Sequence, residues 1–347
     1  MTTVTPPIRW GFDMRLKTMA ALGAATALLL SGCGQEKPGS SNAAGGGAGA
    51  YPTAAVQLIA PAAPGGGWDS TARSLQAVVE ADNLAPEGVE VINIAGAGGT
   101  IGLSQFVTRT DPNTLMVTGA TLVGAIATND STVTLDEVVP IARLTEEHHI
   151  IVVPANSPFK NMGDLVNAMK ADIGAVSIAG GSAGGTDQIT AGLIAEAAGV
   201  DPSLVNYVAF SGGGESLAAL LGGQVSAGIS NVQEYLPQVE AGELRALGVT
   251  APEPIEGVDI PTLVEQGVDV TFANWRCILA PPNTTPEQAQ QVTAWLDTVH
   301  ESQGWQDTMK KNGWTDAYLT GEEFTTFMGE QKAEIRETLV SLGLVEG

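Results

Sequence analysis

Short apolar, β-branched runs alternate with amphipathic segments from residue 51 onward, and this pattern predicts alternating strands and helices. After the first such run, Trp68, Ala72, Leu75, Val78 and Val79 recur at helical spacing, which marks the buried face of one helix. This alternation is typical of βαβ units, so the sequence predicts an α/β fold with a parallel sheet. The predicted strands are Val56–Ala60, Val89–Ile94, Leu115–Thr118, Ile150–Val153, Val176–Ala179, Asn206–Phe210 and Gln224–Ile229.

Two breaker-rich segments, Pro154–Pro158 and Thr250–Pro254, each follow a predicted strand. They indicate two crossings between lobes and therefore a hinged cleft. On this interpretation residues 51–153 and 251–347 form lobe 1, and residues 154–250 form lobe 2. Two amphipathic segments near the C-terminus, Pro286–Val299 and Glu322–Leu342, are expected to be helices that pack back on lobe 1.

The N-terminal segment has the features of an export signal. Arg15 and Lys17 precede the apolar run Met19–Leu30, which is too short to span a membrane as a stable helix. Residues 1–32 are therefore predicted to be a signal peptide and not part of the fold. The true start of translation, Met1 or Met14, stays open.

The signal ends in Leu30-Ser31-Gly32-Cys33, which resembles the lipobox of bacterial lipoproteins, where the cysteine is lipidated. The alternative is a plain secretory signal. A Gly-rich stretch follows, so residues 33–50 are predicted to be a lipid-anchored flexible linker. The resulting location is extracytoplasmic, on the outer face of the cytoplasmic membrane. Cys277 is the only other cysteine, so no disulfide within the chain is expected and Cys277 is predicted to be a buried apolar residue.

Charge and glycine content narrow the class of protein further. Lys and Arg total 15 against 38 Asp and Glu, giving a formal net charge of -23. A chain this acidic repels phosphate backbones, which excludes nucleic acid as a partner. Glycine accounts for 43 of 347 residues, well above common usage.

Four glycine clusters share one context, because each follows a predicted strand and precedes a helix. Backbone N–H groups at a helix N-terminus can hold an anion, and glycine allows the backbone to approach a ligand closely. In open α/β sheets this edge is where ligands bind. The alternative is that the clusters are ordinary tight turns. The clusters are Gly65–Gly67, Gly96–Gly102, Gly180–Gly185 and Gly212–Gly214.

Two acidic residues, Asp69 and Asp187, lie within these clusters. An ionised carboxylate cannot donate a hydrogen bond to an anion. Three roles are open for them: helix N-terminal caps, orienters of a bridging water, or acceptors for a ligand hydroxyl.

Catalytic and metal sites find little support in the sequence. Gly180–Gly184 matches the G-x-S-x-G nucleophile pattern around Ser182, but His300 is the only histidine downstream. His148 and His149 are adjacent on a strand and point to opposite faces, which is a poor metal geometry. There is no Gly-Lys pair and hence no P-loop. We expect no cofactor, no metal and no enzyme activity.

Several segments, in order along the chain, resemble those of the substrate-binding proteins of tripartite tricarboxylate transporters, the Bug family. The likeness extends over roughly residues 55 to 285. It rests on Pro61–Arg73 (PAAPGGGWDSTAR), Gly96–Gly102 (GAGGTIG), Gly181–Thr186 (GSAGGT), Phe210–Gly214 (FSGGG), Leu217–Val225 (LAALLGGQV), Ala241–Leu247 (AGELRAL) and Asn274–Arg276 (NWR).

The resemblance implies a type II periplasmic-binding-protein fold, in which two lobes close over a small carboxylate. It also implies a monomer that delivers its ligand to a permease with a large and a small subunit. Many relatives carry a longer second-lobe loop and a histidine where this chain has Gln188 or Ile189. The ligand-binding residues that the resemblance implies are Gly66, Gly67, Trp68 and Asp69 from lobe 1, and Ser182, Ala183, Gly185, Thr186 and Asp187 from lobe 2.

The sequence therefore predicts a lipid-anchored binding protein for a small, citrate-like di- or tricarboxylate. Two alternatives from other classes stay open. One is an extracytoplasmic carboxylate sensor, which shares the same fold and site. The other is a serine hydrolase that uses Ser182.

Overall fold

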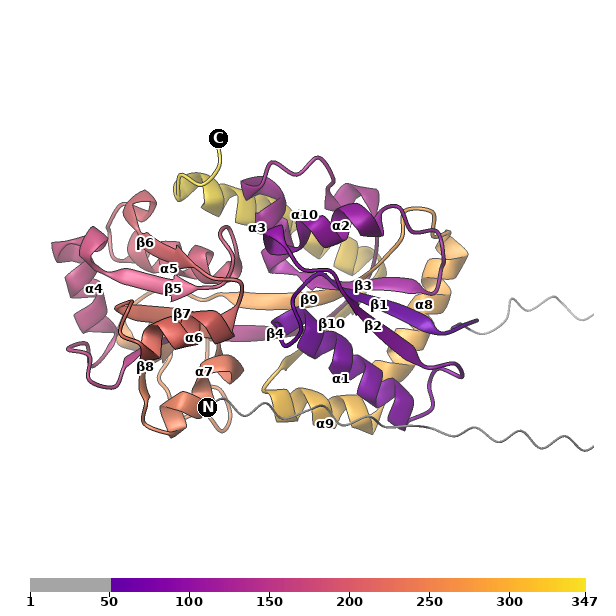
Figure 1. The fold of residues 1–347 in the computed structure, drawn as a ribbon, viewed down its shortest axis with the longest axis horizontal. Coiled ribbons are helices and arrows are strands. Elements are labelled where there is room, and N and C mark those ends of the chain that lie inside the picture. Colours follow the sequence, from indigo (N-terminus) through magenta and orange to yellow (C-terminus); the bar gives the residue numbers. More distant parts are fainter. Residues whose placement is uncertain (1–50) are drawn as a thin grey trace, which may run out of the picture. The chain divides into compact units, whose positions relative to one another are not determined.

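The computed structural model describes residues 51–347, so the predicted signal peptide 1–32, the lipidation site Cys33 and the linker 33–50 lie outside the described residues. Within the described range the chain has the predicted α/β fold, with helices packed against a mixed sheet (Figure 1). The strands are β1 Val56–Ala60, β2 Val89–Asn93, β3 Thr114–Gly119, β4 Val139–Pro154, β5 Ser177–Gly180, β6 Asn206–Ala209, β7 Ala227–Asn231, β8 Leu244–Val249, β9 Ala273–Ala280 and β10 Thr315–Thr320. The α-helices are α1 Gly67–Ala81, α2 Thr100–Phe106, α3 Ala120–Thr128, α4 Met162–Ala171, α5 Thr186–Ala197, α6 Gly213–Leu221, α7 Val232–Glu240, α8 Pro286–Glu301, α9 Gln303–Asn312 and α10 Gly321–Ser341.

The sheet is parallel at both ends and antiparallel in the middle. Its strand order is β2-β1-β3-β9-β4-β7-β5-β6, and β8 and β10 also pair with β4. Strand β1 is parallel to β2 and β3, and β5 is parallel to β6 and β7. Strand β9 is antiparallel to both β3 and β4. The prediction of a parallel sheet is thus confirmed for each end and wrong for the centre, where the two parallel groups are joined through antiparallel strands.

Strand β4 is the element that joins the two groups. It is 16 residues long, whereas the sequence predicted only its last part, Ile150–Val153. Residues 139–148 pair with β9, and residues 149–154 pair with β7 and β8. The residues before Ile150 include polar side chains, so they do not show the apolar pattern of a buried strand. Thr145 and Glu147 are nevertheless buried, because they pack against residues that are distant in the sequence. The predicted lobe boundaries, 153/154 and 250/251, stay a prediction.

Helix α1 forms because its apolar positions fall on one face, as predicted. Gly66 is its N-cap residue, and Trp68, Ala72, Leu75, Val78 and Val79 are all buried. The helix packs on β1, β2 and β3. This packing determines the position of the loop Gly65–Gly67, which lies between the end of β1 and the start of α1.

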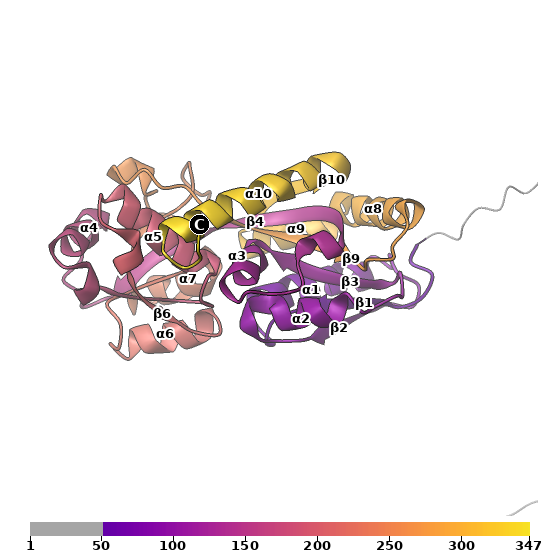
Figure 2. The same cartoon turned by 90° about the horizontal axis from the view of Figure 1, so that it is seen from above.

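The C-terminal helices begin and end close to the predicted bounds. Helix α8 contacts β4, and α10 contacts β4 and α3. Helix α10 also reaches α5, so it packs against elements of both parallel groups (Figure 2). At that contact a Cβ on Gly192 would collide with the Leu342 side chain. The contacts with α3 and β4 agree with the expected packing of this helix, and the contact with α5 is an addition that the sequence did not predict.

The apolar core includes Cys277, which is fully buried and free, as the sequence predicted. Burial raises the pKa of its thiol well above the ordinary value. Among the described residues, no helix combines the length and apolarity that a membrane crossing requires.

Candidate functional site

The glycine clusters meet at one cavity of about 730 Å³. Its walls include Gly65–Gly67 after β1, Gly96–Gly99 after β2, Gly181 and Gly185 after β5, and Gly212–Gly214 after β6. The cavity therefore lies at the carboxyl ends of parallel strands from both ends of the sheet. This is the edge that the sequence predicted for a ligand.

The first loop is held in shape by Asp69 from behind. Its Oδ2 accepts a hydrogen bond from the Gly65 N–H at 2.7 Å, and its Oδ1 accepts one from Asn93 at 2.8 Å. Gly65 has a φ of 82°, a conformation that suits glycine. Burial opposes ionisation, but hydrogen bonds from Gly65, Arg73 and Asn93 outweigh it and lower the pKa of Asp69. Asp69 thus orients the loop and does not line the cavity.

Asp187 has the same task in the third loop. Its Oδ2 accepts a hydrogen bond from the Gly181 N–H at 2.7 Å, and Gln188 Oε1 accepts one from the Gly184 N–H at 2.8 Å. Unlike Asp69, Asp187 also lines the cavity. Burial raises the pKa of Asp187 to about 7, and the nearby charge of Glu234 acts in the same direction.

The fourth loop repeats the arrangement, because Glu215 Oε2 accepts a hydrogen bond from the Ser211 N–H at 3.0 Å. Three of the four glycine loops are therefore fixed by an acidic side chain from the helix that follows. Neither Asp69 nor Asp187 caps its own helix, since α1 and α5 have no side-chain cap at their N-cap glycines. The sequence left three roles open for Asp69 and Asp187, and accepting a hydrogen bond from an amide of the preceding glycine loop was not among them.

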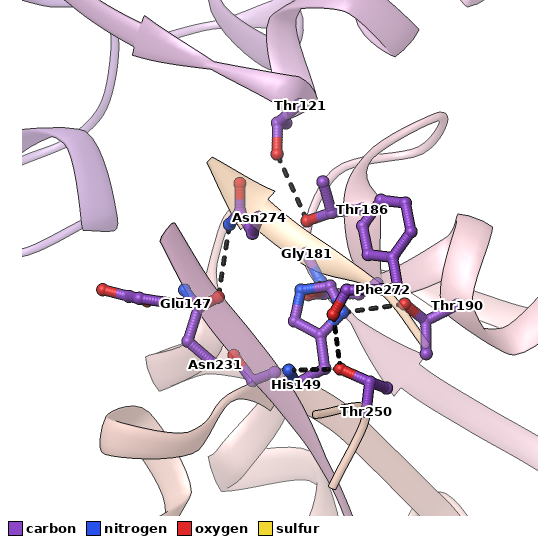
Figure 3. A network of polar contacts seen from close by, with 12 residues as sticks. Thr121, Glu147, His149, Gly181, Thr186, Thr190, Asn231, Thr250, Phe272 and Asn274 are labelled. Atoms are coloured by element: carbon purple, nitrogen blue, oxygen red, sulfur yellow. Dashed lines mark hydrogen bonds and ion pairs between the residues drawn. The ribbon is translucent and has the colours of Figure 1, made fainter. Parts of the chain in front are cut away.

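The two parallel groups approach each other at Thr121 and Thr186. Their hydroxyl oxygens lie 3.4 Å apart (Figure 3). Thr121 is the second residue of α3, and Thr186 is the first residue of α5. Each hydroxyl therefore lies at a helix N-terminus on the cavity wall. A Cβ on Gly185 would lie 2.8 Å from the Ser182 carbonyl oxygen and 3.4 Å from Thr121 Cγ2. Only glycine fits there without displacing the loop.

The buried pair of Arg276 and Glu147 was not predicted as part of the site. Arg276 Nη2 lies 3.0 Å from Glu147 Oε2, and Nη1 donates to Thr71 Oγ1 at 3.2 Å. Burial raises the pKa of Glu147, although the Arg276 charge opposes this shift. Arg276 lines the cavity beside Gly67, where any Cβ would collide with the guanidinium. The motif Asn274–Arg276 was noted in the sequence, and it is the signal that could have identified Arg276.

His149 lies in a polar network close to Gly181 of the Gly180–Gly185 loop (Figure 3). Its Nδ1 is 2.7 Å from Thr190 Oγ1, and its Nε2 is 3.3 Å from Asp187 Oδ1 without hydrogen-bonding geometry. His149 is fully buried while His148 is half-buried, as expected for neighbours on opposite faces of a strand. Burial, with the charges of His148 and Arg276, lowers the pKa of His149 to about 3.

Of the nine predicted ligand-binding residues, the structure brings seven together on the cavity wall. Asp69 lies behind its loop, and Ala183 is exposed and outside the lining. Further lining residues that the sequence reasoning did not assign include Thr121, Ser230, Asn231, Glu234, Asn274 and Arg276. The seven predicted residues are Gly66, Gly67, Trp68, Ser182, Gly185, Thr186 and Asp187.

The hydrolase alternative needs a histidine beside Ser182. His300 instead pairs with Asp316 at 3.0 Å, His148 contacts the Phe272 carbonyl oxygen, and His149 contacts Thr190. Within residues 51–347 no histidine is hydrogen-bonded to Ser182, and no group of three or more His, Cys, Asp or Glu residues could hold a metal ion.

Comparison with known proteins identifies relatives over most of the chain. The family model described as the tripartite tricarboxylate transporter family receptor, TctC, matches residues 72–344. Protein BugT of Bordetella pertussis is 26% identical over 292 residues, which cover 81% of this chain and 87% of BugT.

Solved structures with the same fold include a solute-binding protein. A TctC solute-binding protein from Polaromonas is 25% identical, with a TM-score of 0.65 over 84% of this chain and 100% of that one. The malate-bound MatC of Rhodopseudomonas palustris is 22% identical, with a TM-score of 0.69 over 85% of this chain and 100% of MatC. The expected periplasmic-binding-protein fold is therefore confirmed.

Proposed function

Because this chain belongs to the tripartite tricarboxylate transporter family of receptors, we propose that it binds a small carboxylate and delivers it to a membrane permease. Proteins of this family are periplasmic, extracytoplasmic solute-binding proteins and not enzymes. The permease partner rests on the family description, and the citrate-like ligand class rests on the sequence resemblance.

The observation that carries the proposal is the convergence of separate glycine loops on one cavity. Gly66 and Gly185 are the N-cap residues of α1 and α5, and both lie on the cavity wall. Helix N-termini present unpaired N–H groups and a positive dipole end, which together suit a carboxylate. The hydroxyls of Ser182 and Thr186 add donors that a carboxylate can accept from.

The proposed arrangement in the cell has two further parts. We propose that residues 51–153 with 251–347 and residues 154–250 act as two lobes that close over the ligand. The partner change in β4 at His148 and His149 supports such a division. The anchor on Cys33 rests on the sequence alone, and mass spectrometry of membrane-bound protein would detect the attached lipid.

Calorimetric titration with a panel of small carboxylic acids tests the ligand class. We expect saturable binding of at least one acid, and we expect Gly185→Ala to weaken it by about tenfold or more, which is ~1.4 kcal/mol. The reason is that the added Cβ would lie 2.8 Å from the Ser182 carbonyl oxygen and shift the loop.

The matched control is Gly329→Ala on the exposed side of α10, where a Cβ meets no atom within 4 Å. This variant should bind as the parent protein does. Absence of binding across the whole panel would reject the proposed function, and equal affinity of both variants would reject the role of the Gly185 loop.

A further inference from the structure

The wall of the cavity is more acidic than a site for a di- or tricarboxylate should be. Asp187, Glu215 and Glu234 all line it, and each lies in the first turn of its helix, α5, α6 and α7. Among the described residues that line the cavity, Arg276 is the only Lys, Arg or His, and its charge is paired with buried Glu147 at 3.0 Å. We call Asp187, Glu215 and Glu234 the acidic wall.

A structural role in shaping the glycine loops explains Asp187 and Glu215, but it does not explain Glu234. Asp187 and Glu215 accept loop N–H groups at 2.7 and 3.0 Å, so they are needed to shape the glycine loops. Glu234 accepts only from side chains, Ser230 Oγ at 2.6 Å and Asn231 Nδ2 at 3.3 Å. A carboxylate offers about four acceptor positions, so Glu234 retains capacity for further donors.

The fourth glycine loop is built to admit Glu234. A Cβ on Gly213 would collide with Glu234 Oε2, so the absence of a side chain at Gly213 is what gives this carboxylate its place. Glu234 is also close enough to act on its surroundings, because its charge contributes to the raised pKa of both Asp187 and Glu147.

An unpaired acceptor at the same place is an independent sign of a ligand donor. Asn274 is only 8% exposed and lines the cavity. Its Nδ2 donates to Asn231 Oδ1 at 3.2 Å, while its Oδ1 has no partner in the described structure. In Figure 3 this oxygen points away from Asn231, toward the side where Thr121 and Thr186 lie. Leaving a buried acceptor unpaired is unfavourable, and a donor on the ligand would remove that cost.

Asn231 connects the two acceptors, since it contacts both Glu234 and Asn274. An ammonium group has three donors and a positive charge, so it suits acceptors such as the Glu234 carboxylate and Asn274 Oδ1. A second carboxylate in this position would instead face Glu234 as a like charge.

Other groups of the cavity wall are suited to the carboxylate of the same ligand. Helix α3 begins at Ala120 with no acidic residue in its first turn, and its Thr121 hydroxyl lies on the cavity wall. The glycine loops Gly65–Gly67 and Gly96–Gly99 also line the cavity, and neither loop contains an acidic residue. The cavity wall therefore carries groups that favour an anion as well as groups that favour a cation.

We propose that the ligand carries a cationic nitrogen in addition to its carboxylate, and that Glu234 is the residue that selects for it. This inference rests on the proposed function, since it concerns the same cavity. It narrows the ligand from a citrate-like polycarboxylate to an amino carboxylate.

The test compares ligands that differ only at one end. In glutarate and 4-aminobutyrate, and in adipate and 5-aminopentanoate, an ammonium group replaces one carboxylate at equal chain length. Malate and aspartate form a third pair, with an ammonium group in place of a hydroxyl. We expect the amino member of at least one pair to bind about tenfold or more tightly by titration calorimetry, as hydrogen bonds to charged groups allow.

Glu234→Gln should remove this preference, because it keeps the shape of the side chain and loses its charge. The matched control is Glu240→Gln, an exposed residue at the end of the same helix α7, which should keep the preference. Glu234→Asp retains the charge and should keep part of the preference, which separates charge from folding effects.

Each outcome bears on one of the two proposals. If dicarboxylates bind more tightly than their amino partners in the parent protein, the inference is wrong while carboxylate binding stands. If Glu234→Gln folds and retains the preference, Glu234 does not select the ligand. If no member of any pair and no acid of the wider panel binds, the proposed function itself fails.

Discussion

At the scale of single residues, burial changes the chemistry of polar groups that look ordinary in the sequence. His149 has an ordinary pKa near 6.5, but desolvation on β4 lowers the pKa to about 3 and keeps the ring neutral. Its neighbour Asp187 is shifted the other way, to a pKa of about 7. The two shifts have opposite signs because burial disfavours the charged form of each group, which is the anion for Asp187 and the cation for His149.

His149→Gln should change how the free energy of unfolding depends on pH. The folded pKa of His149 lies below the unfolded value, so its contribution is complete above pH 6.5 and is lost as the pH falls toward 3. The loss is at most about 1.4 kcal/mol per pH unit. Urea denaturation at pH 5 and pH 7 should show a smaller decrease for the variant than for the parent protein.

Asp187 acts with the opposite sign, because its raised pKa makes its contribution decline as the pH rises from about 4 to about 7. Both proteins in the His149 experiment carry Asp187. The difference between their two slopes therefore reports His149 together with its 3.3 Å contact to Asp187, and identical slopes would contradict the prediction.

At the scale of elements, some helices and strands follow from the local hydrophobic pattern, and others depend on packing between residues that are distant in the sequence. Strands such as β1 and β5 and helices α1, α8 and α10 were predictable, because their apolar positions repeat at the local period. Strand β9 and the first part of β4 were not, because Arg276 and Glu147 in their middle look like surface residues. Only the buried ion pair between them explains those residues.

Leu342→Ala tests the contact by which α10 reaches α5. Leu342 is 5% exposed and occupies the space that Gly192 leaves open. We expect the free energy of unfolding to fall by about 2–3 kcal/mol, the lower range for truncating a buried leucine. Ser341→Ala, an exposed neighbour, is the control and should have little effect in the same denaturation measurement. Equal stability of both variants would mean that this contact contributes nothing to the fold.

At the scale of the whole molecule, the charge of the chain works against its proposed ligand. The formal net charge of -23 repels any anion at a distance, and physiological salt screens that repulsion beyond roughly 8 Å. Capture must therefore depend on the loop amides, the hydroxyls and Glu234 at short range.

Salt should affect the association of charged and uncharged ligands differently. Raising the ionic strength from about 0.01 M to about 0.15 M should speed association of glutarate, a dianion, because the repulsion is screened. The rate for 4-aminobutyrate, which has no net charge, should change much less. Stopped-flow tryptophan fluorescence, to which Trp68 on the cavity wall contributes, provides the measurement. The same salt dependence for both ligands would show that the net charge does not govern capture.

Features that depend on neighbouring residues along the chain could be predicted without the structure. The glycine clusters, the strands that precede them and the helices that follow were all readable, because turns, caps and amphipathic faces are local. Seven of the nine predicted site residues indeed lie on one cavity wall.

Tertiary structure alone decided which charges face that cavity. Glu234, Asn274 and Arg276 come from α7 and β9, outside the glycine loops, and the hydrophobic periodicity does not distinguish them from surface residues. Their position results from the antiparallel pairing of β4 with β7 and β9. Because that pairing is non-local, the sequence indicated a site for anions, and only the fold showed that acidic side chains also line it.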